Sequence, residues 1–256
     1  MGRKTSFGLS PAELVGFPRD LISALHASAH TVVLTGSGIS AESGVPTFRE
    51  AQTGLWARFD PQELATSEAF ERDPSLVWDW YVWRRKLVAG ALPNPGHLAI
   101  SGMQELVPYL TLVTQNVDGL HQRAGSRQVI ELHGNIRRTR CSVEGTEIEE
   151  YDDTESPPVC PSCGAALRPD VVWFGEMLPS GALKTASEAS RQSDFFLSVG
   201  TSSLVYPAAA LPFEALENGA TLVEVNPGET PLTSHADYVL RGLAGDILPR
   251  LIRELS

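Results

Sequence analysis

The sequence lacks any long hydrophobic run. No stretch of about 18 apolar residues, the length that a membrane-spanning helix needs, occurs in its 256 residues. Two basic residues near the N-terminus, Arg3 and Lys4, are not followed by the apolar segment of a secretory signal. We therefore expect neither a bilayer span nor a membrane partner.

Cysteine and positive charge are both scarce. The chain has three cysteines, an odd number with two of them in one C-x2-C, which argues against a disulfide framework and indicates a reducing cytoplasm. Its 20 Lys and Arg face 31 Asp and Glu, and the net charge of −11 argues against nucleic-acid binding through a basic face. With 42% hydrophobic residues, the length suits one large or two modest domains and leaves the oligomeric state open.

Short apolar runs alternate with helical segments along most of the chain. A helix is predicted over 11–29, with Ser10 as its cap and Pro11 at its first position. Residues 61–90 are helix-like, and a closing helix covers 246–255. Strands are expected near 31–35, 110–114, 129–135, 194–203, 220–227 and 237–242. The alternation predicts an α/β fold with a Rossmann-like, doubly wound parallel sheet.

Polar or glycine residues follow each strand, in GSG, QNVD, HGN, GTSS and NPG. Ligands of open parallel sheets bind at these carboxyl ends. The first loop, GSGISA, fits G-x-G-x-x-G/A, in which Gly36 allows a tight turn and Gly38 lets the backbone approach a pyrophosphate. A structural turn is the alternative. The acidic residue that a dehydrogenase places about 20 residues further on is missing, so a dinucleotide would be held differently here.

Residues 137–172 do not follow this alternation of strands and helices. They contain all three cysteines, an acidic stretch and paired prolines, which indicates a small inserted module. Cys141, Glu144, Cys160 and Cys163 form C-x2-E-x15-C-x2-C, a spacing within the range of a zinc ribbon. A glutamate oxygen can ligate zinc. Three hypotheses remain open: Glu144 completes the site, Asp152 or a water does so, or the module folds without metal.

Six motifs occur in order: GSGISAESGVPTFR, TQNVDGLH, ELHGN, VVWFGE, GTSSLVYPA and EVNP. Together they resemble the sirtuin family of NAD-dependent protein deacylases, over about residues 20–250. The chain departs from the family pattern at Ser37 (usually alanine), at Thr47 (often aspartate) and at Glu144, since the family usually has four zinc-binding cysteines. The resemblance implies one catalytic region, 1–256, with these parts: a large NAD-binding part at 20–136 and 173–256, a helical insertion at about 45–95, and a zinc-ribbon-like module at 137–172.

The resemblance also implies a reaction. In the family, the acyl oxygen of a modified lysine attacks the nicotinamide ribose of NAD as nicotinamide leaves, and a histidine acts as general base on a ribose hydroxyl. Water then releases free lysine and O-acyl-ADP-ribose. These roles fall on His133, Asn116 and Asp118, and a neutral imidazole suits base catalysis near neutral pH. His121 is expected to be structural, and the remaining histidines, including His97, have no motif support for catalysis and are expected to be ordinary.

The cofactor and substrate contacts follow in the same way. An aromatic ring can shield a reactive sugar from water, and an arginine can pair with phosphate. The resemblance assigns NAD binding to Gly36, Ser37, Gly38, Ser40, Ala41, Phe48, Arg49, Gln115, Asn116, Asp118, Gly200, Thr201, Ser202, Asn226 and Ala244. The expected partners are acylated lysine side chains of proteins, with main-chain pairing to Val172, Trp173, Phe174 and Gly175.

Tyr81 and Arg84 have a Y-x-x-R spacing, which places both on one helical face. In a subset of sirtuins this pair binds the carboxylate of succinyl- or malonyl-lysine, and Ala65 matches a small residue that leaves the pocket roomy. An arginine fork fits a carboxylate, whose burial without a partner is costly. An aromatic, basic helix in the core is the alternative. The expected enzyme removes acidic acyl groups as well as acetyl. A protein ADP-ribosyltransferase and a non-catalytic binding module are the alternative functions.

Overall fold

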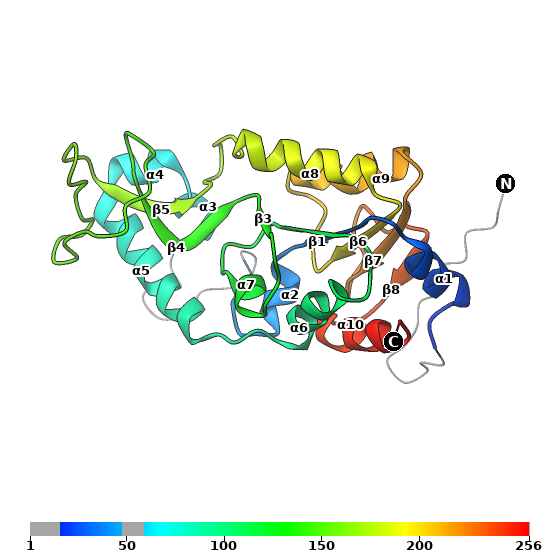
Figure 1. Cartoon of the computed structure of the whole chain (residues 1–256). Coiled ribbons are helices and arrows are strands. Elements are labelled where there is room, and N and C mark those ends of the chain that lie inside the picture. The colour runs from blue at the N-terminus through cyan, green and yellow to red at the C-terminus, as the bar shows by residue number, and fades with distance from the viewer. Residues whose placement is uncertain (1–15, 48–58, 256) are drawn as a thin grey trace.

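The structure is a computed structural model, and it describes residues 16–47 and 59–255. Six strands form one parallel sheet in the order β3-β2-β1-β6-β7-β8 (Figure 1). The strands are β1 (Thr31–Thr35), β2 (Leu110–Thr114), β3 (Ile130–Glu131), β6 (Phe195–Val199), β7 (Thr221–Val225) and β8 (Tyr238–Leu240). The predicted doubly wound α/β fold is therefore confirmed, and all six expected strands are present. The strand order reverses between β1 and β6, which is where such sheets bind ligands.

Helices cover both faces of the sheet, which agrees with its continuous apolar strands. One face packs against α1 (Arg19–Ala27), α6 (Pro95–Met103) and α10 (Ala244–Arg253), and the other against α8 (Ser180–Gln192) and α9 (Leu211–Glu217), which a short 3-10 helix (Ala208–Ala210) precedes (Figure 1). Successive residues of β1 belong to the apolar cores on opposite faces of the sheet. Val33 lies in the core shared with α1, α6 and α10, and Val32 and Leu34 lie in the core shared with α8 and α9.

The first helix begins later than predicted. Residues 1–15, with the proposed cap Ser10 and Pro11, lie outside the described part of the chain, but Gly16 to Pro18 are described and are not helical. The helix starts at Arg19 because the ring of Pro18 disfavours helical backbone in the residue before it.

A second lobe combines the helical insertion with an antiparallel strand pair, at the far left in Figure 1. The helix-like stretch 61–90 is divided into α3 (Pro61–Leu64), α4 (Ser67–Arg72) and α5 (Pro74–Gly90). The breaks occur because Thr66 and Asp73 act as N-caps, accepting hydrogen bonds from the amides of Ala69 and Leu76.

The strand pair consists of β4 (Gly134–Cys141) and β5 (Leu167–Val171). It shares an apolar core with α5 that includes Trp80, Ile136 and Trp173. Among the described residues, no helix has the length and apolar character needed to cross a membrane.

Candidate functional site

Polar side chains meet at the carboxyl end of the sheet. Asn116 and Asp118 follow β2 and are buried, and Ser40 of α2 (Ser37–Ala41) lies between them. The Ser40 hydroxyl donates to Asp118 Oδ2 at 2.8 Å and accepts from Asn116 Nδ2 at 3.0 Å. Asn116 Nδ2 also donates to the carbonyl of Gly36 at 3.0 Å. Burial raises the pKa of Asp118. The structure thus brings together three predicted site residues from two strand ends.

His133 follows β3 and is half-buried. Its Nδ1 lies 2.8 Å from the main-chain oxygen of Gln115. Because a carbonyl oxygen can only accept, Nδ1 carries the proton of the neutral ring and Nε2 is left as a proton acceptor. Burial lowers the pKa of His133, and the bond to Gln115 opposes that shift in part. The imidazole is therefore neutral at neutral pH, as a general base must be.

The glycines of the GSGISA loop have a structural role that the sequence did not reveal. A Cβ on Gly36 would lie 2.8 Å from the oxygen of Gly200, and one on Gly38 would lie 2.7 Å from that same atom. The Gly38 amide donates to this oxygen at 2.8 Å, and Gly200 has a φ of +59°. These glycines therefore allow the ends of β1 and β6 to approach closely, and their approach to a pyrophosphate stays a prediction.

Thr201 joins three strand ends. Its hydroxyl accepts a hydrogen bond from Gln115 Nε2 at 3.0 Å, and its carbonyl accepts one from Asn226 Nδ2, also at 3.0 Å. Gln115 follows β2, Thr201 follows β6, and Asn226 follows β7. These predicted cofactor contacts therefore lie along one edge of the sheet, beside half-buried Ser202.

The remaining predicted cofactor contacts lie on helices or outside the described residues. Ser37 is exposed at the first position of α2 and Ala41 ends that helix. Ala244 is buried at the first position of α10. Phe48 and Arg49 lie outside the described residues.

Two histidines without an assigned role lie beneath the site. His97 Nε2 is 3.4 Å from the Ser40 hydroxyl, and His121 Nε2 is 2.9 Å from the hydroxyl of Thr35. Burial lowers the pKa of His97 to about 4 and that of His121 to about 3, so both rings are neutral. His97 was predicted to be ordinary, but it belongs to the network that holds Asp118. A sequence signal existed, because Asn94 and His97 form the capping box of α6.

Tyr81 and Arg84 lie together on α5, as the Y-x-x-R spacing predicts. The guanidinium carbon of Arg84 is 5.7 Å from the centre of the Tyr81 ring. Burial raises the pKa of Tyr81 to about 12, and it lowers the pKa of Arg84. The Tyr81 hydroxyl and the Asp118 carboxylate oppose this lowering of the Arg84 pKa in part. Ala65 is buried between α3 and α4.

The segment 172–175 follows β5 and is partly bonded to its own chain. The amide of Val172 donates to the His133 carbonyl and that of Phe174 to the Ala65 carbonyl, both at 2.9 Å. The Trp173 amide donates to the carboxylate of Glu176 at 2.8 Å. Main-chain pairing with a substrate would therefore have to use groups other than these three amides.

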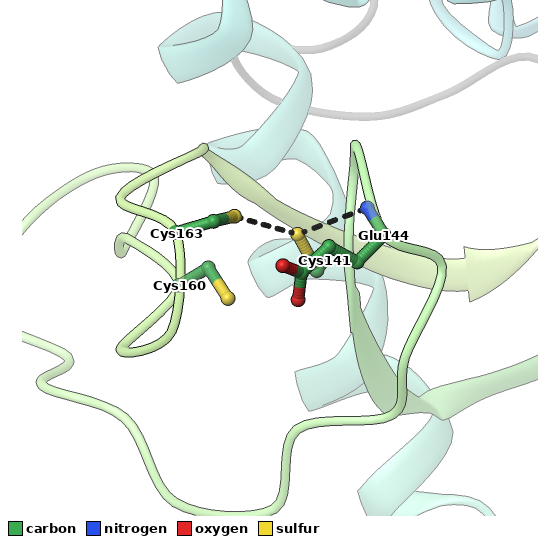
Figure 2. Close-up of side chains that lie close together, drawn as sticks. All are labelled: Cys141, Glu144, Cys160 and Cys163. Atoms are coloured by element: carbon green, nitrogen blue, oxygen red, sulfur yellow. Dashed lines mark hydrogen bonds between the residues drawn. The ribbon is translucent and has the colours of Figure 1, made fainter.

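A second cluster lies in the β4–β5 lobe. Cys141, Glu144, Cys160 and Cys163 place their ligand atoms within 4.8 Å of one another (Figure 2). All three cysteines are free thiols, and Asp152, the alternative fourth ligand, instead accepts hydrogen bonds from Thr154. Three sulfurs and one carboxylate form a donor set that suits zinc.

Comparison with known proteins gives one family match: residues 36–207 match the model of the Sir2 family. An NAD-dependent protein deacylase of Aquifex aeolicus is 60% identical over 208 residues, which cover 80% of this chain and 87% of that protein.

Solved structures agree with the sequence matches. The crystal structure of a Sir2 homolog–NAD complex superposes with a TM-score of 0.88 at 46% identity, covering 94% of each chain. A complex of Sir2 with a p53 peptide and NAD+ has a TM-score of 0.83 at 33% identity, covering 92% of this chain and 97% of that one.

Proposed function

This chain belongs to the Sir2 family, and from that premise we propose that it is an NAD-dependent protein deacylase that removes succinyl and malonyl groups as well as acetyl groups from lysine. Its substrates are then acylated lysine side chains of proteins. The observation that supports the acidic-acyl specificity is the position of Tyr81 and Arg84 on one face of α5, with Arg84 in electrostatic range of Asp118.

Different residues of the chain have separate roles in the proposed reaction. NAD, when bound, would supply the ribose carbon to which the acyl oxygen of the modified lysine bonds, with nicotinamide as the leaving group. His133 Nε2 takes the proton of a ribose hydroxyl, while the Gln115 carbonyl keeps the imidazole in the required tautomer. Asn116 and Asp118, joined by Ser40, orient the polar groups of the nicotinamide end. Phe48 and Arg49, which the resemblance assigns to NAD binding, lie outside the described residues.

The other NAD contacts lie along the strand ends. The loop from Gly36 to Ala41 and the turn from Gly200 to Ser202 bind the phosphates, and Asn226 binds the second ribose. Ala244 presents its backbone to adenine. The support for this assignment is that Thr201 connects Gln115 and Asn226 across the ends of β2, β6 and β7.

The acyl preference follows from charge. A carboxylate that enters a buried pocket must be paired, because its loss of hydration is otherwise not offset. Arg84 offers a planar cationic fork, and Tyr81, with its pKa near 12, keeps a hydroxyl proton to donate. An acetyl group has no charge to satisfy and is small enough for the same pocket, so both activities are expected.

Nicotinamide release from NAD tests the function directly. We expect release with an acetyl-lysine peptide and with a succinyl-lysine peptide, and none above background with the unmodified peptide. Mass spectrometry separates deacylation, which frees lysine, from ADP-ribosyl transfer, which adds mass to the protein. Equal nicotinamide release with and without the acyl group would contradict the proposal.

We also propose that the cysteine lobe holds a structural zinc ion. Cys141, Glu144, Cys160 and Cys163 would supply four ligands, which is the closed set typical of a structural rather than a catalytic site. The ion would tie the turn after β4 to the turn before β5. Free thiols at these positions also support a cytoplasmic location.

Metal analysis of the purified chain should find about one zinc per molecule. Replacing Glu144 with alanine should weaken zinc affinity by at least about tenfold in competition with a chromophoric chelator, since losses of that size follow even from mutation of supporting residues. Glu147→Ala, an exposed acid in the same loop, is the matched control and should bind zinc normally. Less than about 0.2 zinc per wild-type chain would rule out a tightly held ion.

A further inference from the structure

The side chain of Trp173 makes a contact that the reaction described above does not use. Its indole Nε1 donates a hydrogen bond to the hydroxyl oxygen of Tyr81 at 3.0 Å, and both residues are 2% exposed. Trp173 follows β5, whereas Tyr81 lies on α5, so two elements meet at this bond. In the described part of the chain, it is the one hydrogen bond of the Tyr81 hydroxyl.

This bond determines which way the Tyr81 proton can point. An indole N–H can donate and cannot accept, so the Tyr81 oxygen must be the acceptor. The phenol has a single proton, which is therefore directed away from Trp173. A carboxylate can only accept, so it requires Tyr81 in this donating state.

The indole is itself held in place by its surroundings. The guanidinium carbon of Arg168 lies 3.3 Å from the centre of the Trp173 ring, and the Phe70 ring lies 5.2 Å away. Arg168 is nearly buried and donates to both carboxylate oxygens of Glu176, at 2.5 and 3.0 Å. Glu176 in turn accepts the amide proton of Trp173. The orientation of the indole N–H is thus determined by packing and by an ion pair together.

We propose that Trp173 is a specificity-determining positioning residue, whose indole N–H occupies the acceptor side of the Tyr81 hydroxyl and so holds the phenolic proton for the carboxylate of an acidic acyl group. This inference rests on the proposed removal of succinyl and malonyl groups. It assigns the tryptophan side chain a task separate from main-chain pairing with substrate. An acetyl group ends at the carbon from which a malonyl or succinyl chain continues to its carboxylate, so it has no acceptor for this proton.

Trp173→Phe keeps a packed ring and removes the donor. The ratio of kcat/KM for a succinyl-lysine peptide to that for an acetyl-lysine peptide should fall about fivefold, the size expected for one hydrogen bond. The fall should appear mainly in KM of the succinyl peptide, because the Tyr81 proton binds the acyl end and takes no part in bond breaking. Trp78→Phe makes the same change on α5 in a residue that packs in the cysteine lobe, and its ratio should stay at the wild-type value.

A double-mutant cycle tests whether Trp173 acts through Tyr81. In a Tyr81→Phe background, Trp173→Phe should cause no further fall in the ratio, because the hydroxyl that it positions is gone. Additive losses would overturn the inference, and so would equal losses on both peptides in the single variant. If Trp173→Phe does not fold, site-specific replacement by benzothienylalanine keeps the shape of the indole with sulfur in place of the N–H. It should reproduce the fivefold fall.

The two proposals fail in different ways. If wild-type protein does not act on the succinyl peptide, or if Arg84→Met lowers both activities equally, the acidic-acyl specificity itself is wrong. If Arg84→Met is selective but the Trp173 variants are not, only the positioning role of Trp173 is wrong.

Discussion

Replacing His133 with tyrosine is expected to lower kcat/KM for NAD-dependent deacylation by about 10²- to 10⁴-fold, the range typical for loss of a general base. Nε2 of His133 is the proton acceptor because Nδ1 donates to the Gln115 carbonyl. A tyrosine hydroxyl is protonated near neutral pH and cannot take over that task. The measurement is nicotinamide release with acetyl and succinyl peptides, and both should fall together.

His26→Tyr is the matched control, because His26 is exposed in the last turn of α1, a helix to which no predicted site residue belongs. That variant should retain wild-type activity, and both variants should show the same thermal transition. The wild-type pH profile gives an independent check. Since the neutral ring is the active form and burial lowers its pKa, activity should be level through neutral pH and fall only below about 6.5. Substantial turnover by His133→Tyr would remove His133 from the base role.

Replacing Arg84 with methionine is expected to lower kcat/KM for a succinyl-lysine peptide by about 100-fold, and for an acetyl-lysine peptide by far less. Loss of one partner of a buried ion pair costs about 3 kcal/mol, because the remaining charge is left without a partner. Methionine keeps the length of the side chain, so the change is mainly one of charge. The measurement is kcat/KM for both peptides at saturating NAD.

Lys86→Met removes one positive charge from the same helix and is the matched control, since Lys86 is exposed. Its two activities should match those of the wild type. Equal losses on the two peptides in Arg84→Met would contradict the acidic-acyl specificity. High salt should have little effect on the selectivity, because an ion pair made with half-buried Arg84 is screened less than a surface pair.

Several parts of the fold could be predicted because their causes are local. The β-branched runs at Thr31–Thr35 and Leu110–Thr114 became parallel strands, and the polar residues after each strand, such as Asn116 and His133, lie at the carboxyl edge of the sheet. Helix breaks were harder to predict. Asp73 ends α4 and caps α5, a double use that periodicity alone does not reveal.

Contacts between distant residues could not be predicted in the same way. The assignment of Gly38 to a cofactor stays a prediction, and its close approach to Gly200 could not be foreseen, because it results from the parallel pairing of β1 with β6. His97 seemed ordinary because its relation to Ser40 exists only when α6 packs beside α2. The spacing suggested that Cys141 and Cys163 belong to one metal site. Their ligand atoms come together because the turn after β4 and the turn before β5 lie side by side.

By itself, the sequence determined the parallel sheet, the order of its strands along the chain, the motifs at the strand ends and the one-face spacing of Tyr81 and Arg84. These features depend on burial periodicity and turn chemistry, which act over a few residues. Only the tertiary structure decided that the indole of Trp173, 92 positions from Tyr81, would determine the direction of that hydroxyl proton. A hydrogen bond requires two atoms within about 3 Å at a suitable angle, and no local pattern contains that information.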